Sequence, residues 1–137
     1  EEEAARARAW EILERVGLTE WADHPAEGLP LGLQRILEIA RALAATPQLL
    51  LLDEPGAGLN PSEKARLAEL IRQLHQEGIT ILLVEHDMSL VMGLAEEIAV
   101  LDHGRLIAEG PPEAIQRDPR VIAAYLGEEE LPHVARG

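Results

Sequence analysis

The chain has 137 residues, the size of one domain, and 47% hydrophobic with 27% charged residues is the composition of a globular protein. It contains no cysteine, which excludes disulfides, thiolate metal sites and a cysteine nucleophile. Asp and Glu number 25 against 12 for Lys and Arg, so the net charge is −13. Because such a surface repels phosphate backbones, we expect no nucleic-acid partner.

The sequence also lacks targeting and membrane signals. No apolar run approaches the length of a membrane span, and the chain opens with Glu1, Glu2 and Glu3 instead of a signal peptide. We therefore expect a cytoplasmic protein. Since there is no initiator Met, we also expect the sequence to be a piece of a longer chain.

Helical spacing predicts two helices before the first strand. The first helix ends at Gly17, and its apolar face is formed by Ala9, Ile12, Leu13 and Val16. A turn-rich stretch follows over residues 19–28, and the second helix is predicted over about residues 33–44. Four consecutive leucines, residues 49–52, then predict a strand buried on both faces, as in a parallel sheet covered by helices.

The next helix has the clearest start signals. Asn60 is its predicted N-cap, Pro61 its first residue, and Glu63 stands in capping-box register. The helix is expected to end at Gly78. A second buried strand is predicted over residues 79–84.

The remaining residues predict short elements. A short helix is expected over residues 89–95, followed by a hairpin of residues 98–101 and 106–108 that turns at 102–104. Pro112 and Pro119 each introduce a further short helix, and residues 128–137 are predicted to form a loose acidic tail. The alternation of strands and helices predicts an α/β fold with a parallel sheet.

Polar residues follow both predicted parallel strands, where open α/β sheets place functional groups. Asp53 and Glu54 are adjacent carboxylates, so one can hold Mg²⁺ while the other orients or deprotonates a water. Alternatively, they are the first polar residues of a loop. His86 follows the second strand and can donate to a phosphoryl oxygen, or it is a surface histidine, and Asp87 can cap the next helix.

Together these motifs resemble the carboxyl-terminal portion of an ATP-binding-cassette (ABC) ATPase, which has a P-loop NTPase-like, three-layer fold. Residues 49–53 resemble the Walker B strand, Glu54 the catalytic glutamate, and His86 the switch histidine. The segment at 29–35 lies where the family signature belongs, just before a helix. The resemblance to the family D-loop rests on Gly56, Ala57, Gly58, Leu59 and Asn60.

The resemblance implies a motor subunit in which two ATPase subunits sandwich ATP and drive a membrane permease. Asp53 is then the Mg²⁺ ligand, Glu54 polarises the attacking water, and His86 senses the γ-phosphate. Residues 56–60 lie at the dimer interface, and the signature residues Gly32 and Gln34 reach the nucleotide of the partner subunit. The subunit is expected at the inner face of the cell membrane.

Within the family, three segments look most like the importers of branched-chain amino acids. These segments are residues 58–61, 84–88 and 118–127. The resemblance divides the chain into a helical and signature region, 1–46, and a Walker B to C-terminal region, 47–127.

The chain departs from the family pattern in two places. It has no Walker A motif, G-x-x-x-x-G-K-[ST], and its single lysine is Lys64. In the signature, Pro30 replaces the usual Ser, Leu31 a Gly or Tyr, and Leu33 a Gln, and proline has neither hydroxyl nor N–H.

Two other functions stay open. The chain can be a non-catalytic interaction module that keeps the fold, or a relative acting on DNA or ribosomes, which the negative charge disfavours. For the isolated chain we expect inactivity and self-association, because strands that normally pack beside residues 49–52 and 79–84 are missing.

Overall fold

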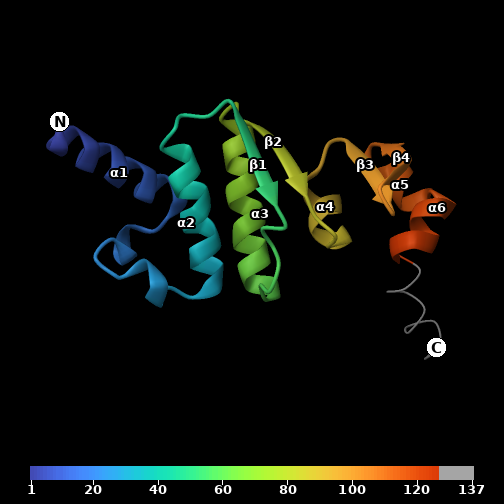
Figure 1. Cartoon of the computed structure of the whole chain (residues 1–137), viewed down its shortest axis with the longest axis horizontal. Helices are drawn as coiled ribbons and strands as arrows, with labels where there is room; N and C mark the ends of the chain where they lie inside the picture. The colour runs from blue at the N-terminus through green and yellow to red at the C-terminus, as the bar shows by residue number, and fades with distance from the viewer. Residues whose placement is uncertain (127–137) are drawn as a thin grey trace. The chain divides into compact units, whose positions relative to one another are not determined.

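A computed structural model describes residues 1–126, which form two compact units (Figure 1). The first unit runs from Glu1 to Glu85, and the second begins at His86. The predicted tail, 128–137, lies outside the described residues. Within residues 1–126, no helix is long and apolar enough to cross a membrane.

The first unit alternates helices and strands. Its elements are α1 (Glu2–Val16), the 3₁₀ turns η1 (Thr19–Trp21) and η2 (Ala26–Gly28), α2 (Leu31–Leu43), β1 (Leu49–Asp53), α3 (Pro61–Gln76) and β2 (Thr80–Val84). The predicted stop of the first helix is confirmed, because Gly17 caps α1 in the left-handed conformation with φ of 76°.

Helix α2 begins earlier than the sequence pattern predicted. Pro30 is its N-cap, and the Pro30 carbonyl accepts hydrogen bonds from the N–H groups of Leu33 and Gln34, both at 3.0 Å. The expectation that the signature residues precede the helix is therefore wrong from Leu31 onward. These residues form the first turn of α2.

The predicted parallel sheet is confirmed for β1 and β2, which pair in register from Leu49 and Thr80 to Asp53 and Val84. Burial alternates along β1: Leu50 and Leu52 are buried, and Leu49, Leu51 and Asp53 are exposed. One face of the pair is thus turned toward the core and the other is not.

The prediction of strands buried on both faces is wrong for the described residues. Leu51 is 64% exposed and its register partner Leu82 is 57% exposed, and Leu49 and Val84 are exposed on the same face. The predicted α/β class with a parallel sheet is confirmed, and among residues 1–85 no helix covers this face. A run of four leucines satisfies a one-sided and a two-sided burial pattern equally well, so the run alone could not distinguish them.

The core of the first unit lies among its helices and the buried face of β1. Helix α2 contacts α1 and α3, and α3 contacts β2. The most deeply buried side chains of the two central helices are Ile36, Leu43, Leu67 and Leu74. Leu70 and Ile71 of α3 are buried as well.

The second unit contains α4 (Met88–Leu94), β3 (Ile98–Asp102), β4 (Arg105–Gly110), α5 (Pro112–Arg117), α6 (Pro119–Val121) and the π-helical turn η3 (Ile122–Leu126). The predicted hairpin is confirmed: β3 and β4 are antiparallel, and His103 and Gly104 at its tip both have positive φ. The unit has its own small core, formed by Met88, Ile98, Val100, Ala108, Ile115 and Val121.

Candidate functional site

The carboxyl ends of β1 and β2 lie at the same end of the first unit as the first turns of α2 and α3 (Figure 1). Parallel pairing brings Asp53, the last residue of β1, opposite Val84, the last residue of β2. Asp53, Glu54 and Glu85 therefore all lie at or directly after strand ends on the same side of the first unit, where open α/β sheets place functional groups.

Asp53 lies on the exposed face of β1, on the same side of the sheet as Leu51. Within residues 1–126, no group of three or more His, Cys, Asp or Glu side chains is arranged to hold a metal ion. Magnesium sites, however, commonly use one or two carboxylates and take their other ligands from water and substrate phosphates. The exposed Asp53 carboxylate is a metal ligand of this kind, so its chemistry is compatible with Mg²⁺.

Glu54 has a backbone conformation that is unexpected for its residue type. Its φ is 47°, in the left-handed region that residues with a Cβ seldom adopt. The Glu54 N–H donates to the carbonyl of Val84 at 2.7 Å, which ties this turn to the end of β2. Strained conformations of this kind concentrate at functional sites, where the surrounding structure holds them in place.

The segment at 56–60 is fixed to both neighbouring elements. The Gly56 N–H donates to Oε2 of Glu85 at 2.9 Å, and Arg35 on α2 donates through Nη2 to the Ala57 carbonyl at 3.5 Å. Gly58 has φ of 78° and is exposed, whereas Leu59 is buried. The assignment of this segment to a dimer interface stays a prediction.

Glu85 is a residue whose role sequence reasoning missed. The motif at 84–88 drew attention to His86, yet it is the Glu85 carboxylate that holds the first residue of the 56–60 segment. Its position directly after β2 was the available signal.

The two signature residues singled out from the sequence are both engaged within the chain. The Gly32 N–H donates to Oε2 of Glu63 at 2.9 Å, and the Gln34 side chain donates through Nε2 to the Leu29 carbonyl at 3.0 Å. Their contact with a partner's nucleotide stays a prediction.

His86 opens the second unit and so belongs to a different unit from Asp53 and Glu54. The predicted cap beside it is confirmed, because Oδ1 of Asp87 accepts from the Leu90 N–H at 3.2 Å and from the Ser89 hydroxyl at 2.8 Å. The role of His86 toward a phosphate stays a prediction.

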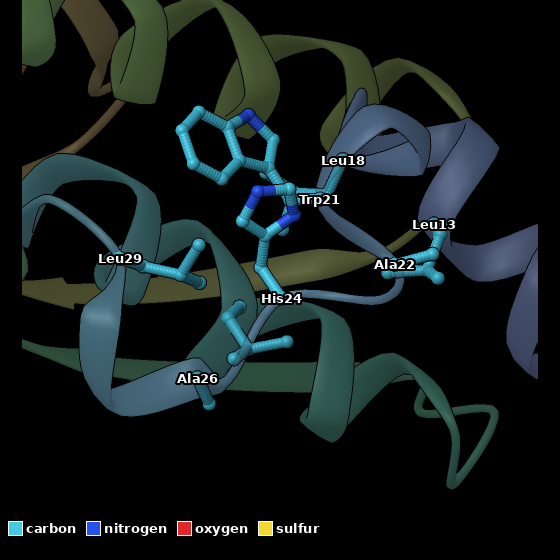
Figure 2. Close-up of a pocket in the computed structure, with 8 residues that line it drawn as sticks. Leu13, Leu18, Trp21, Ala22, His24, Ala26 and Leu29 are labelled. Carbon is cyan, nitrogen blue, oxygen red and sulfur yellow. The ribbon is translucent and has the colours of Figure 1, made fainter.

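A separate apolar hollow of about 210 Å³ lies between α1, the two 3₁₀ turns and α2 (Figure 2). Inside it the rings of Trp21 and His24 lie with their centres 4.9 Å apart. The other lining residues are Leu13, Leu18, Ala22, Ala26, Leu29 and Leu37. None of the predicted site residues lines this hollow, so it is distinct from the strand-end site.

Comparisons with known proteins agree with this geometry. A family model described as "ABC transporter" matches residues 1–57, and one described as "Branched-chain amino acid ATP-binding cassette transporter" matches residues 105–130. The chain is 52% identical over 124 residues to LivG of Escherichia coli (strain K12), a high-affinity branched-chain amino acid transport ATP-binding protein, covering 90% of this chain and 48% of LivG. It is 51% identical over 117 residues to BraF of Pseudomonas aeruginosa, a protein of the same description, covering 85% and 46%.

Solved structures give the same result. A nucleotide-free ATP-binding cassette from an ABC transporter matches with a TM-score of 0.83 at 32% identity, over 91% of this chain and 51% of that one. An ATP-binding cassette in its ADP conformation matches with a TM-score of 0.81 at 32% identity, over 88% and 49%.

The fold and these matches thus identify the chain with the ATP-binding cassettes, a class of nucleotide-binding proteins. The chain belongs to the family of ABC transporter ATP-binding proteins, in the group similar to the branched-chain amino acid importers. It spans about half the length of the curated relatives that it matches.

Proposed function

We propose that this chain supplies the Walker B and signature portion of the ATPase subunit of an importer for branched-chain amino acids. The observation that carries the proposal is the Asp53–Glu54 pair at the carboxyl end of a parallel strand, in a chain half identical to LivG and BraF. Both relatives are described as ATP-binding proteins for high-affinity transport of branched-chain amino acids.

Each site residue has a proposed task. Asp53 would hold Mg²⁺, which when bound neutralises charge on the nucleotide phosphates. Glu54 would accept a hydrogen bond from the attacking water and orient it, and its backbone bond to Val84 fixes where its side chain starts. His86 would donate a hydrogen bond to the γ-phosphate.

The subunit would act as one of a pair. Gly32 and Gln34 would approach the nucleotide held by a second ATPase subunit, and Gly56, Ala57, Gly58, Leu59 and Asn60 would line the interface between the two. The pair would bind a membrane permease at the cytoplasmic face of the cell membrane. This assignment is supported by the relatives' description as transport ATP-binding proteins.

The test is a chimera in which the part of Escherichia coli LivG that precedes its match to this chain is fused to Glu1. That part is expected to carry the phosphate-binding loop that this sequence lacks. The chimera should bind ATP in a calorimetric titration with Mg²⁺, whereas the chain alone should show no binding. It should also hydrolyse ATP, and Glu54→Gln should slow hydrolysis by about 10²-fold to 10⁴-fold without loss of ATP binding.

The matched control is Glu69→Gln, which changes an exposed carboxylate on α3 and should leave hydrolysis as it is. A chimera that folds and binds ATP but hydrolyses it equally well with Gln at position 54 would contradict the assignment of Glu54. A chimera that folds and binds no nucleotide would favour the non-catalytic interaction module.

A further inference from the structure

The carboxylate of Glu63 joins two separate segments of the site. Its Oε1 accepts from the Asn60 N–H at 3.0 Å, while the Glu63 N–H donates to Oδ1 of Asn60 at 2.8 Å, which completes the predicted capping box of α3. Its other oxygen, Oε2, accepts from the Gly32 N–H at 2.9 Å. A capping box needs only one side-chain oxygen, so the second oxygen is available to link α3 to the first turn of α2.

The Glu63 side chain, in its observed position, leaves no room for a Cβ at position 32. A Cβ at position 32 would lie 2.3 Å from Oε2 of Glu63 and 2.9 Å from its Cγ and Cδ. Only glycine allows the α2 backbone to approach the carboxylate this closely. Gly32 is also buried, so its N–H depends on this partner in place of water.

A second bond between the same segments lies one turn along α2. Arg35 donates from Nη2 to the Ala57 carbonyl at 3.5 Å. The first two turns of α2 are therefore held against residues 57–63 at two points. This joins the signature residues of α2 to the segment at 56–60.

We propose that Glu63 is a positioning residue of the ATPase, which fixes the signature turn of α2 on the 56–60 segment so that both meet the partner subunit in one arrangement. The inference rests on the proposed function, in which both segments face the second subunit. Glu63 itself would contact neither the nucleotide nor the attacking water. Its effect would pass through Gly32 and Asn60.

The variant Glu63→Gln separates this role from helix capping. Glutamine also serves in a capping box, but its side chain offers only one oxygen, and its NH₂ group is a donor. Whichever way the amide turns, either the Gly32 or the Asn60 N–H faces another donor and loses its acceptor. Amide hydrogen exchange on the full chain should therefore become faster at one of these two residues by about tenfold or more, and remain unchanged in the cores of α2 and α3.

The readout on function is a split between kcat and KM in the LivG chimera. Glu63→Gln should lower kcat by about tenfold to hundredfold, because the signature turn is misplaced, and should leave KM for ATP nearly unchanged. Glu69→Gln, on the same helix and exposed, is the control and should change neither. The steric clash between a Cβ at position 32 and the Glu63 side chain gives a second test. Gly32→Ala should lower kcat when Glu63 is present, and should lower it less in the Glu63→Ala background.

The outcomes distinguish the two proposals. If Glu54→Gln stops hydrolysis but kcat is unchanged in a Glu63→Gln variant with faster exchange at Gly32, or in Glu63→Ala, which removes both bonds, the positioning role is overturned and the proposed function stands. Unchanged exchange at both amides would overturn the positioning role directly. If Glu54→Gln has no effect on hydrolysis, the proposed function fails first.

Discussion

Glu54, the proposed catalytic residue, has an unfavourable backbone conformation. Its φ of 47° lies in the left-handed region, where the Cβ of an L residue costs about 1–2 kcal/mol of conformational energy. We predict that Glu54→Gly is more stable than Glu54→Ala by about 1 kcal/mol, since both variants lack the carboxylate and differ only in the Cβ. Urea unfolding of the two variants measures this difference directly.

The comparison also separates stability from activity at this position. In the LivG chimera both variants should have lost hydrolysis, so that the more stable protein is no more active. Equal unfolding free energies for the glycine and alanine variants would mean that the turn between Glu54 and Val84 stores little strain.

Residue-level features could be predicted where they depend on neighbours in sequence. The capping box of Asn60 and Glu63 and the cap by Asp87 are local patterns, and both are found in the structure. The bond from Gly32 to Glu63 joins residues 31 positions apart, and nothing in the spacing of either segment indicates it. The left-handed conformation of Glu54 was equally hidden, because the residue type argues against it.

At the scale of elements, α1 and α3 are linked by an ion pair at the surface. Arg15, in the last turn of α1, donates through Nε to Oε2 of Glu77 at 2.8 Å, and Gln73 donates to the other oxygen at 3.2 Å. The hydrogen bond from Arg15 lowers the pKa of Glu77 below its ordinary value of 4.5, and the bond from Gln73 and the charge of Arg15 act in the same direction. The carboxylate form is thus favoured in the folded state.

The sign of the pH dependence follows. Because the pKa of Glu77 is lower in the folded state, the ion pair stabilises the protein above pH 4.5. This stabilisation is lost as the pH falls through the pKa of the folded state. Both side chains are about one-third exposed, so we predict that Glu77→Gln costs only about 0.5 kcal/mol at neutral pH and nothing in strong acid. Denaturant midpoints of both proteins across the acid range measure it.

The control is the same substitution in an Arg15→Gln background, where the pH-dependent difference should nearly vanish. A loss of stability in Glu77→Gln that stays constant down to strong acid would show that Glu77 acts through packing or through Gln73, without the charge of Arg15.

The sequence predicted the elements better than their surroundings. Gly17, the capping box and the turn at His103 and Gly104 mark ends and turns through backbone preferences, and these boundaries agree closely with the structure. The start of α2 was misplaced because Pro30 caps a helix whose first turn, Leu31 onward, resembles a loop motif. Burial of the strands was misjudged because it depends on what lies across the sheet.

At the scale of the whole molecule, the site described here is built at one edge of a two-stranded parallel pair. The parallel direction of β1 and β2 places the residues after both strands at the same end of the pair, which the sequence predicted for Asp53, Glu54 and His86 but not for Glu85. The hydrogen bonds that link α2 to α3 and to residues 56–60, and residues 56–60 to Glu85, could not be predicted from the sequence, since each joins residues more than 20 positions apart.

The exposed face of this pair leads to the last prediction. Leu49, Leu51, Leu82 and Val84 are all more than half exposed on one side of the sheet. Contiguous apolar surface of this kind favours association, and within residues 1–126 β1 and β2 each have one edge that pairs with no other strand. We predict that the 137-residue chain self-associates in a concentration-dependent way, and that Leu51→Lys combined with Leu82→Lys shifts it toward monomer in sedimentation velocity.

The matched control is Leu101→Lys combined with Leu106→Lys, two residues that are paired and exposed on the hairpin of the second unit. It tests whether the apolar face of the hairpin also contributes to self-association. This control should leave the association largely intact if the β1–β2 face is responsible. Fusion to the LivG part should also reduce self-association, because that part is expected to cover the same face. A wild-type chain that sediments as a monomer at high concentration would contradict the prediction and would mean that the exposed leucines are too few, or too dispersed, to hold two copies together.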